Sequence, residues 1–429
     1  MRPKACLVTI CAAALVLGLS SGAGLAYTYK KLYDFCSKQS CVDGAAPQAG
    51  LVVDSSGNLY GTTTGGGFNN GGTVFELSFN ASKHSWKYQR LHTFCRELSC
   101  ADGGAPYGTL IIDTAGNLYG TTYQNGAYGL GTVFELTPGA AGHKAVFKLL
   151  YTFPTGLGHS MAGLSYAGQS SGLAYDGTSA VFGTGVNSGS QQQGSLFMLT
   201  PGTPSWTYSD LHDFCVGGGR CHDGSGVVSG VILDADGDLF GTTQNTAFEL
   251  SPAAPGGHFT VLYTACENLY CKQGSNLHSS LLMDSTGDLL GTAIYGGDVH
   301  HGCCGVLYEL TQAGHGWNHG VVYDFCSRRD CDDGQQPQGP LIMAASGALV
   351  GTTPYGGGNT IDDNHAGGGT VYSLSGTALI TLYAFCAQSS CADGEYPYAG
   401  VVEDMTGNLF GTTAYGGNSD LGVVFELTP

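Results

Sequence analysis

The chain has 429 residues, more than one compact domain usually holds, although a closed repeat fold can reach this size. The formal net charge is −18, which makes nucleic acid a poor partner because phosphate binding requires clustered Lys and Arg. Glycine accounts for 71 residues, but an aromatic content of 10% argues against disorder, because disordered chains are poor in aromatic residues. The glycines are therefore interpreted as turns between many short strands.

The N-terminus has the features of a secretion signal. Arg2 and Lys4 precede an apolar stretch at residues 5–19, and small residues at 24–26 offer a cleavage site. We expect residues 1–26 to be a signal peptide and residues 27–429 to be secreted, either outside the cell or into the periplasm. The apolar stretch is short for a spanning helix, and no other segment is suited to cross a bilayer.

One sequence phrase recurs in seven units along the chain. Its fullest form is Asn-Leu-Tyr-Gly-Thr-Thr at residues 117–122, followed by Gly-Thr-Val-Phe-Glu-Leu-Thr-Pro at residues 131–138. A period of about sixty residues predicts a repeat architecture. The Gly-Thr pair inside the phrase is present in every unit, with its glycine at Gly61, Gly120, Gly183, Gly241, Gly291, Gly351 and Gly411.

Each unit offers the same four strand candidates, here named A to D. In the first unit these are residues 50–53, 58–63, 73–77 and 86–94, and an Asp-x-x-Gly turn at Asp54 separates A from B. Short strands at close and regular spacing predict an all-β fold. The third unit is degenerate, and its first three strands are expected at residues 172–176, 180–184 and 194–199.

The two ends of the chain complement each other. Residues 30–35 form a D strand with no A, B or C before it, whereas the last unit ends after its C strand. This arrangement predicts a seven-bladed β-propeller of four-stranded blades, closed by the N-terminal strand, which completes the last blade. The expected boundaries are 27–36 for that outer strand and 49–94, 108–153, 171–214, 228–265, 279–325, 339–385 and 399–429 for the blades.

The repeat phrases resemble those of the GloVer-type choice-of-anchor tandem-repeat proteins, a family of secreted bacterial proteins. The Asp-x-x-Gly-Asn-Leu-Tyr stretch is also similar to the blade motif of periplasmic propellers of sensor kinases. The resemblance covers nearly the whole mature chain and implies a propeller, but it brings no established activity. The chain ends at Pro429 without a sorting tail, so we expect free release rather than surface anchoring.

Six units carry a cysteine pair in the loop from D to the next A. Four or five residues separate the partners, which allows a local disulfide, and a secreted protein meets an oxidising compartment. Metal binding is the alternative, although a metal site would need pairs from different blades to converge. The pairs are Cys36/Cys41, Cys95/Cys100, Cys215/Cys221, Cys266/Cys271, Cys326/Cys331 and Cys386/Cys391.

The loop between B and C in the fifth unit differs from all other copies. Its adjacent Cys303 and Cys304 favour a vicinal disulfide, while a soft-metal site that also uses His300 and His301 is the sharper alternative. We expect no metal and no cofactor elsewhere.

In a propeller, the D–A and B–C loops share one face, and loops on a rigid scaffold commonly carry binding sites. Tyrosines begin several B–C loops, and an aspartate follows the second cysteine of five D–A loops. These residues form either a ring of aromatic and acidic groups that binds a ligand, or packing and loop-capping groups. They are Tyr123, Tyr295, Tyr355, Tyr415, Asp43, Asp102, Asp223, Asp333 and Asp393.

The sequence therefore predicts a secreted, monomeric binding or scaffold module that recognises a carbohydrate, peptide or surface partner through its loop-rich face. The alternative is an extracellular enzyme, such as a glycan hydrolase or lyase, with its site at the channel mouth. No nucleophile elbow, phosphate loop or zinc-protease helix is present, so catalysis is the less favoured of the two.

Overall fold

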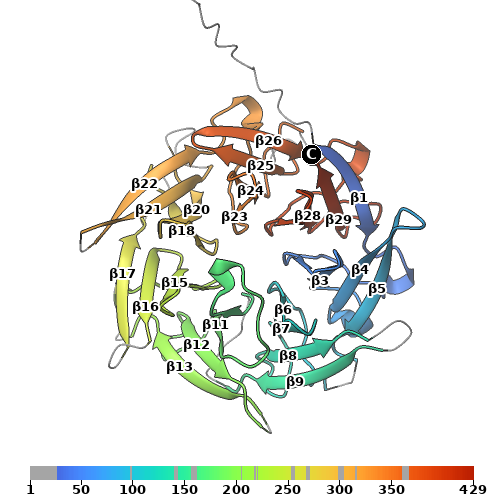
Figure 1. Cartoon of the computed structure of the whole chain (residues 1–429), viewed down its shortest axis with the longest axis horizontal. Coiled ribbons are helices and arrows are strands. Elements are labelled where there is room, and N and C mark those ends of the chain that lie inside the picture. The colour runs from blue at the N-terminus through green and yellow to red at the C-terminus, as the bar shows by residue number, and fades with distance from the viewer. Residues whose placement is uncertain are drawn as a thin grey trace, which may run out of the picture.

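The computed structural model describes residues 27–96, 99–139, 144–155, 162–203, 205–216, 219, 221–252, 257–266, 271–297, 304–314, 316–359 and 367–429. These residues form seven antiparallel sheets arranged as a ring of blades (Figure 1). The predicted all-β, seven-bladed propeller is confirmed. The expected signal peptide lies outside the described residues.

Within each blade the strands follow chain order from the axis to the rim. The first blade holds β2 (Val52–Val53), β3 (Leu59–Thr63), β4 (Thr73–Asn80) and β5 (Ser85–Thr93). The second holds β6 (Ile111–Ile112), β7 (Leu118–Thr122), β8 (Thr132–Thr137) and β9 (Val146–Thr152). The third holds β10 (Ser165–Tyr166), β11 (Val181–Gly185), β12 (Ser195–Thr200) and β13 (Thr207–Asp213).

The remaining blades follow the same plan. The fourth holds β14 (Ile232–Leu233), β15 (Leu239–Thr242), β16 (Thr246–Ser251) and β17 (His258–Thr264). In the fifth, β18 (Ser275–Leu277) and β19 (Leu282–Met283) both pair with β20 (Leu289–Tyr295), followed by β21 (Val306–Ala313) and β22 (Gly316–Asp324). The sixth holds β23 (Ile342–Met343), β24 (Leu349–Thr353), β25 (Thr370–Ser375) and β26 (Ala378–Ala384).

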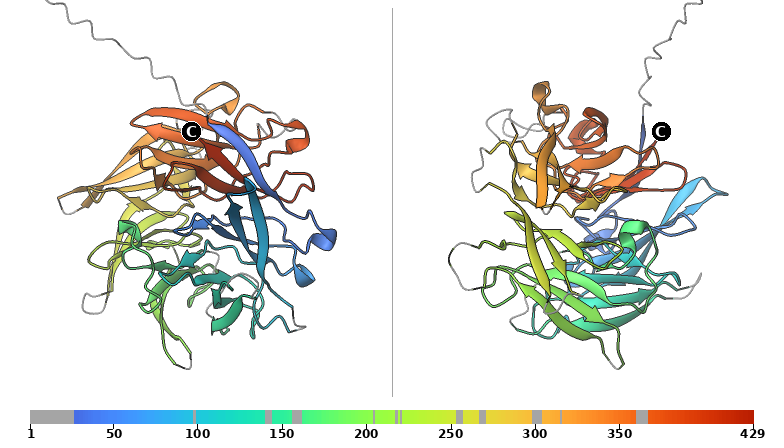
Figure 2. Two further views of the ribbon diagram at one scale, coloured as in Figure 1. Left: turned by 45° about the vertical axis from the view of Figure 1, so that its right-hand side comes forward. Right: turned by 60° about the vertical axis from the view of Figure 1, so that its left-hand side comes forward.

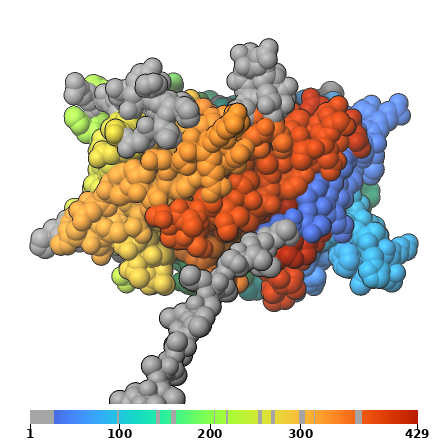
Figure 3. All heavy atoms as spheres, turned by 90° about the horizontal axis from the view of Figure 1, so that it is seen from above, coloured from blue at the N-terminus to red at the C-terminus, as the bar shows by residue number. Residues whose placement is uncertain are grey.

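The last blade joins the two ends of the chain. It holds β27 (Val402–Glu403), β28 (Leu409–Thr413) and β29 (Val423–Thr428), and its outer strand is β1 (Thr28–Asp34). β1 runs antiparallel to β29, from Thr28 opposite Thr428 to Asp34 opposite Val423. Figure 2 shows β1 beside the C-terminus in both views, and Figure 3 shows β1 (blue) against the red strands at the rim. The predicted closure is confirmed.

The predicted position of the innermost strand of the third blade is wrong. The innermost strand is β10, which pairs with Val181 and Phe182, and not residues 172–176. Both segments are apolar, but Leu164, next to β10, is buried, whereas Leu173 is 63% exposed. Residues 167–180 instead form a long A–B connection that contains the 3₁₀-helix η3 (Gln169–Ser171).

The recurring glycine of each B strand leaves room for an aromatic side chain of strand C. Gly61 lies opposite Phe75, and a Cβ at Gly61 would stand 2.7 Å from the Phe75 ring and 2.7 Å from Leu51. The same pairing places Phe134, Phe197, Phe248, Tyr308, Tyr372 and Phe425 opposite the other six glycines. All seven rings are buried, so the repeated phrase encodes the core of each blade.

A belt of stacked aromatic rings joins the outer strands of neighbouring blades. Six of the seven junctions carry one such pair: Tyr33–Tyr88, His92–Phe147, Tyr151–Tyr208, His212–Phe259, Tyr263–His319 and Tyr383–Tyr29. Their ring centroids lie between 4.0 Å (Tyr33–Tyr88) and 5.7 Å (Tyr151–Tyr208) apart. At the junction of the fifth and sixth blades, Leu379 packs in the same cluster as Tyr323 instead. β1 takes part in two of the stacks, which adds side-chain packing to the closure.

Candidate functional site

The six predicted cysteine pairs are confirmed as local disulfides. They are Cys36–Cys41, Cys95–Cys100, Cys215–Cys221, Cys266–Cys271, Cys326–Cys331 and Cys386–Cys391. Several of the bridged loops contain a short 3₁₀-helix, namely η1 (Gln39–Cys41), η5 (Arg329–Cys331) and η6 (Ser389–Cys391); η2 (Phe68–Asn70) lies in the first B–C loop. The disulfides indicate an oxidising compartment.

The unusual loop of the fifth blade is described only in part. Cys304 is buried and disulfide-bonded. His300, His301 and Cys303 lie outside the described residues, so both interpretations of this loop stay predictions.

The five predicted aspartates connect the disulfide loops to the aromatic belt. Asp43 is buried and accepts hydrogen bonds from the Tyr33 hydroxyl at 2.7 Å and the Ser37 backbone N–H at 3.0 Å. Asp333 and Asp393 repeat this arrangement with Tyr323 and Tyr383.

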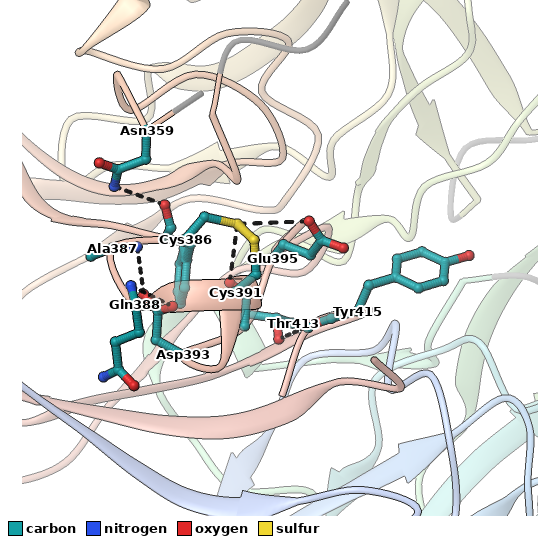
Figure 4. The surroundings of a disulfide bond; sticks show 12 residues. Asn359, Cys386, Ala387, Gln388, Cys391, Asp393, Glu395, Thr413 and Tyr415 are labelled. Atoms are coloured by element: carbon teal, nitrogen blue, oxygen red, sulfur yellow. Dashed lines mark hydrogen bonds between the residues drawn. A yellow bond between two sulfur atoms is a disulfide. The ribbon is translucent and has the colours of Figure 1, made fainter. Parts of the chain in front are cut away.

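In two blades a histidine replaces the tyrosine: His92 lies 3.0 Å from Asp102, and His212 lies 3.1 Å from Asp223. Figure 4 shows Asp393 turned into its loop, where it accepts from the N–H groups of Ala387 and Gln388. This geometry corresponds to the loop-capping alternative.

The predicted tyrosines do not all occupy equivalent positions. Tyr355 and Tyr415 pair with Gln335 and Glu395 in matching bridges, but the equivalent bridge of the second blade uses Gln124. Tyr123 therefore precedes the common position by one residue, which corrects the expected alignment. Successive strand residues point to opposite sides, so this offset changes the direction in which the ring projects. Tyr295 shares the common position and ends β20, where it pairs with Ser275 in the fifth blade.

Three predicted tyrosines gather with three that the sequence interpretation missed. The ring of Tyr396 lies 5.2 Å from Tyr355, 5.9 Å from Tyr415 and 6.3 Å from Tyr398, measured between centroids. The hydroxyl groups of Tyr355 and Tyr398 are 3.3 Å apart, which joins the sixth blade to the seventh. We call Tyr107, Tyr123, Tyr355, Tyr396, Tyr398 and Tyr415 the tyrosine cluster.

The second blade supplies the other part of the tyrosine cluster. Tyr107 and Tyr123 lie 5.5 Å apart in an edge-to-face arrangement. Burial, together with the nearby hydroxyl groups of Tyr123 and Tyr415, raises the pKa of Tyr107. Tyr107 thus lies near enough to Tyr415 of the seventh blade for the two hydroxyl groups to interact electrostatically. In Figure 4 the Tyr415 side chain extends away from the Cys386–Cys391 disulfide, and it is 38% exposed.

A cavity of about 630 Å³ follows the axis below this cluster. All seven blades contribute to its wall through the residues in and around their innermost strands, and Tyr107 and Tyr398 belong to both the wall and the cluster. Its described lining includes no Asp, Glu, Lys or Arg. Its polar side chains come from Gln, Ser, Thr, Tyr and one histidine, His278. Burial lowers the pKa of His278, which favours a neutral imidazole that both donates and accepts.

The position of His278 shows why the cavity lining was missed in the sequence. Gln48, Tyr107, Val228, Gln338 and Tyr398 occupy the same place after the D–A loop in other blades. These residues share the same distance along the chain from the A strand, but they are of different residue types. A search for recurring residues therefore passes over this ring, because its members differ between blades.

An acidic group lies in the fifth blade. Carboxylate oxygens of Asp284, Asp288 and Glu309 lie within 4.8 Å of one another. Burial, followed by the charges of Asp288 and Asp284, raises the pKa of Glu309. Asp284 accepts hydrogen bonds from the N–H groups of Thr286 and Asp288, as the turn aspartates of other blades do. The group is therefore explained by the repeat.

Comparison with known proteins agrees with this architecture. A family model described as the Gloeobacter/Verrucomicrobia repeat matches residues 19–180 and 243–429, which is most of the chain. A search of curated proteins found no match. No helix among the described residues is long and apolar enough to cross a membrane.

Solved structures are similar to this chain at low sequence identity. The extracellular domain of a putative hybrid two-component system from B. thetaiotaomicron is 13% identical with a TM-score of 0.57, and the match covers 93% of this chain and 39% of that one. The chain thus spans about two fifths of that structure. A polysaccharide lyase, Uly1, is 12% identical with a TM-score of 0.46, and 92% of each chain is covered. At these identities the likeness to the first structure shows the fold alone.

Proposed function

The chain belongs to the Gloeobacter/Verrucomicrobia repeat family, and we propose that it is an extracellular carbohydrate-binding propeller whose ligand docks at the tyrosine cluster. The observation that carries this proposal is the convergence of six tyrosines from three blades at the mouth of an uncharged axial cavity. Tyrosine offers an apolar ring face and a hydroxyl, which suit a ligand that has C–H faces and many hydroxyl groups.

The charge distribution favours a neutral ligand. With a net charge of −18, the protein repels polyanions, and no charged side chain is present in the described cavity wall to pair with a peptide terminus. A neutral sugar leaves no buried charge without a partner. We therefore favour carbohydrate over peptide within the ligand classes that the loop-rich face suits.

The backbone at Tyr396 supports a role beyond packing. Tyr396 has φ 56°, in the left-handed region that a bulky residue adopts at a cost of about 1 kcal/mol or more. The first and second blades place Ala46 and Ala105 at this position, both with φ 51°. Alanine thus adopts the same backbone conformation in two blades, and the ring of Tyr396 lies at the centre of the cluster.

A hydrolase that uses two carboxylates finds little support in the described wall. Such a reaction needs a carboxylic acid and a carboxylate within about 10 Å of each other, and the described lining holds neither. Binding without turnover is thus the function that the cavity supports best. We further propose that the chain is exported with cleavage after residue 26 and acts as a monomer.

Two variants on a glycan array test the proposal. Tyr396→Ala keeps a backbone already adopted by Ala46 and Ala105, and Tyr415→Ala removes an exposed ring. Each is expected to weaken binding to any recognised neutral glycan at least about tenfold, equivalent to about 1.4 kcal/mol. Tyr128→Ala serves as the control, because Tyr128 is 58% exposed in a B–C loop and outside the cluster.

The same array separates binding from catalysis. Wild-type protein that recognises no neutral glycan, or binding that both cluster variants retain in full, would refute the proposal. Recovery of shortened glycans after incubation would instead support the enzyme alternative.

A further inference from the structure

We infer that the axial cavity receives the end of a glycan chain and excludes internal stretches of it, an inference that rests on the proposed carbohydrate function. A cavity that is open at one end can accept a terminal unit, whereas a cleft that is open along its length can accept any unit. Three features of the structure assign this cavity to the first kind.

The first feature is continuity between the mouth and the cavity. Tyr107 and Tyr398 line the cavity and also belong to the tyrosine cluster. Gln48, Gln338 and His278 stand at the same level in three other blades. A chain held against the tyrosines thus meets hydrogen-bonding groups as it enters the axis.

The second feature is a waist of small residues one layer further in. The lining residues of this layer are Gly50, Thr109, Gly163, Gly230, Ser280 and Pro340, and Gly400 holds the matching sequence position in the seventh blade. The strands approach closely there: a Cβ on Gly400 would stand 2.4 Å from the Pro340 carbonyl oxygen, and one on Gly163 would stand 2.5 Å from that of Thr109. Small side chains keep the axis open at this level.

The third feature is a cap at the far end. Where five other blades have a tight Asp-x-x-Gly turn, the third blade has residues 167–180, and their helix η3 lies near the centre of the ring in Figure 1 (green). Gln169 and Ser170 of η3 line the cavity. The segment is fixed on both sides, because the Ser170 hydroxyl donates to the Leu233 carbonyl and the Thr114 N–H donates to the Tyr175 carbonyl at 3.0 Å.

Anchoring to two neighbouring blades makes the cap a fixed part of the fold. Tyr175 is almost fully buried, and its ring lies 5.1 Å from that of Tyr119 of the second blade. Leu233 belongs to β14 of the fourth blade. A glycan that enters from the tyrosine mouth therefore meets η3 at the far end of the cavity and cannot thread through.

The experiment measures how binding depends on chain length. Neutral linear hexasaccharides (malto-, cello-, laminari-, xylo- and chito-) and long polymers of the same linkages are titrated into the full-length secreted protein. End recognition predicts a constant number of bound proteins per glycan chain, equal for hexasaccharide and polymer. A number that rises in proportion to chain length would overturn the inference and leave the proposed function intact.

A waist variant provides a second readout. Ser280→Phe narrows the cavity below the mouth and is expected to weaken binding of the recognised hexasaccharide at least tenfold, while Tyr128→Ala, which lies outside both the cavity and the tyrosine cluster, retains wild-type affinity. Full affinity in Ser280→Phe would overturn the inference. Should Ser280→Phe fail to fold, the chain-length titration decides alone. Wild-type protein that binds no probe overturns both the inference and the proposed function, so the two failures are distinct.

Discussion

The role of the five aspartates that follow the second cysteine of a D–A loop can be tested at Asp43. The Asp43 carboxylate accepts hydrogen bonds from the Tyr33 hydroxyl at 2.7 Å, the Ser37 hydroxyl at 2.7 Å and the Ser37 N–H at 3.0 Å. Hydrogen bonds to a charged group each contribute about 1.5–3 kcal/mol. Ser37 is exposed, so water can replace part of its loss, whereas the Tyr33 hydroxyl is partly buried between blades.

We therefore expect Asp43→Ala to lower the free energy of unfolding by about 3 kcal/mol. This total counts two lost hydrogen bonds, from the Tyr33 hydroxyl and from one backbone N–H, at about 1.5 kcal/mol each. Urea denaturation followed by circular dichroism measures this change. Asp236→Ala is the matched control, because Asp236 is an exposed aspartate of an A–B turn and its loss should change stability by under about 0.5 kcal/mol.

The outcome separates the two interpretations of the aspartates. If Asp43 caps its loop, Asp43→Ala lowers the free energy of unfolding, and the protein that remains folded binds glycan with unchanged affinity. Wild-type stability combined with lost affinity would refute the capping interpretation and restore the ligand-binding one. Equal destabilisation by Asp43→Ala and Asp236→Ala would show that the disulfide loop does not depend on its carboxylate.

Two further predictions concern the core and the cavity. Gly61→Ala should destabilise the protein by about 1–3 kcal/mol in the same denaturation assay, because its Cβ would stand 2.7 Å from Phe75, whereas Gly320→Ala, with open space around it, should be neutral. Burial lowers the pKa of His278 below its usual value of 6.5, so the unfolded chain binds a proton at this group more readily than the folded protein does. The free energy of unfolding is therefore unaffected by this group above about pH 6.5 and decreases as the pH falls below that value. His278→Gln should therefore make unfolding midpoints less sensitive to acid below that pH, and an unchanged pH profile would contradict this reasoning.

Much of the fold could be predicted from the sequence because its evidence is local and repeated. The Asp-x-x-Gly turns, the B-strand glycines and the unpaired D strand at the N-terminus recur or complement each other at fixed spacing, and each has a direct geometric meaning. The disulfides followed for the same reason, since five or six positions along one loop bring the cysteines together. Only the first strand of the third blade was placed wrongly, because two apolar segments are candidates for it, and burial of Leu164 and exposure of Leu173 distinguish them.

The candidate site depended on tertiary structure. The sequence by itself determined the number of blades, the way in which the ring closes and the cysteine pairs, because these features repeat with a fixed period. It could not show that Tyr107, Tyr396 and Tyr398 join Tyr355 and Tyr415, since the contacts connect blades that are far apart along the chain. Residues on an axis meet through the closure of the ring, and their types vary from blade to blade. The residues that the repeats share thus form the blades, whereas the candidate site consists of residues that differ between repeats and meet only in the folded ring.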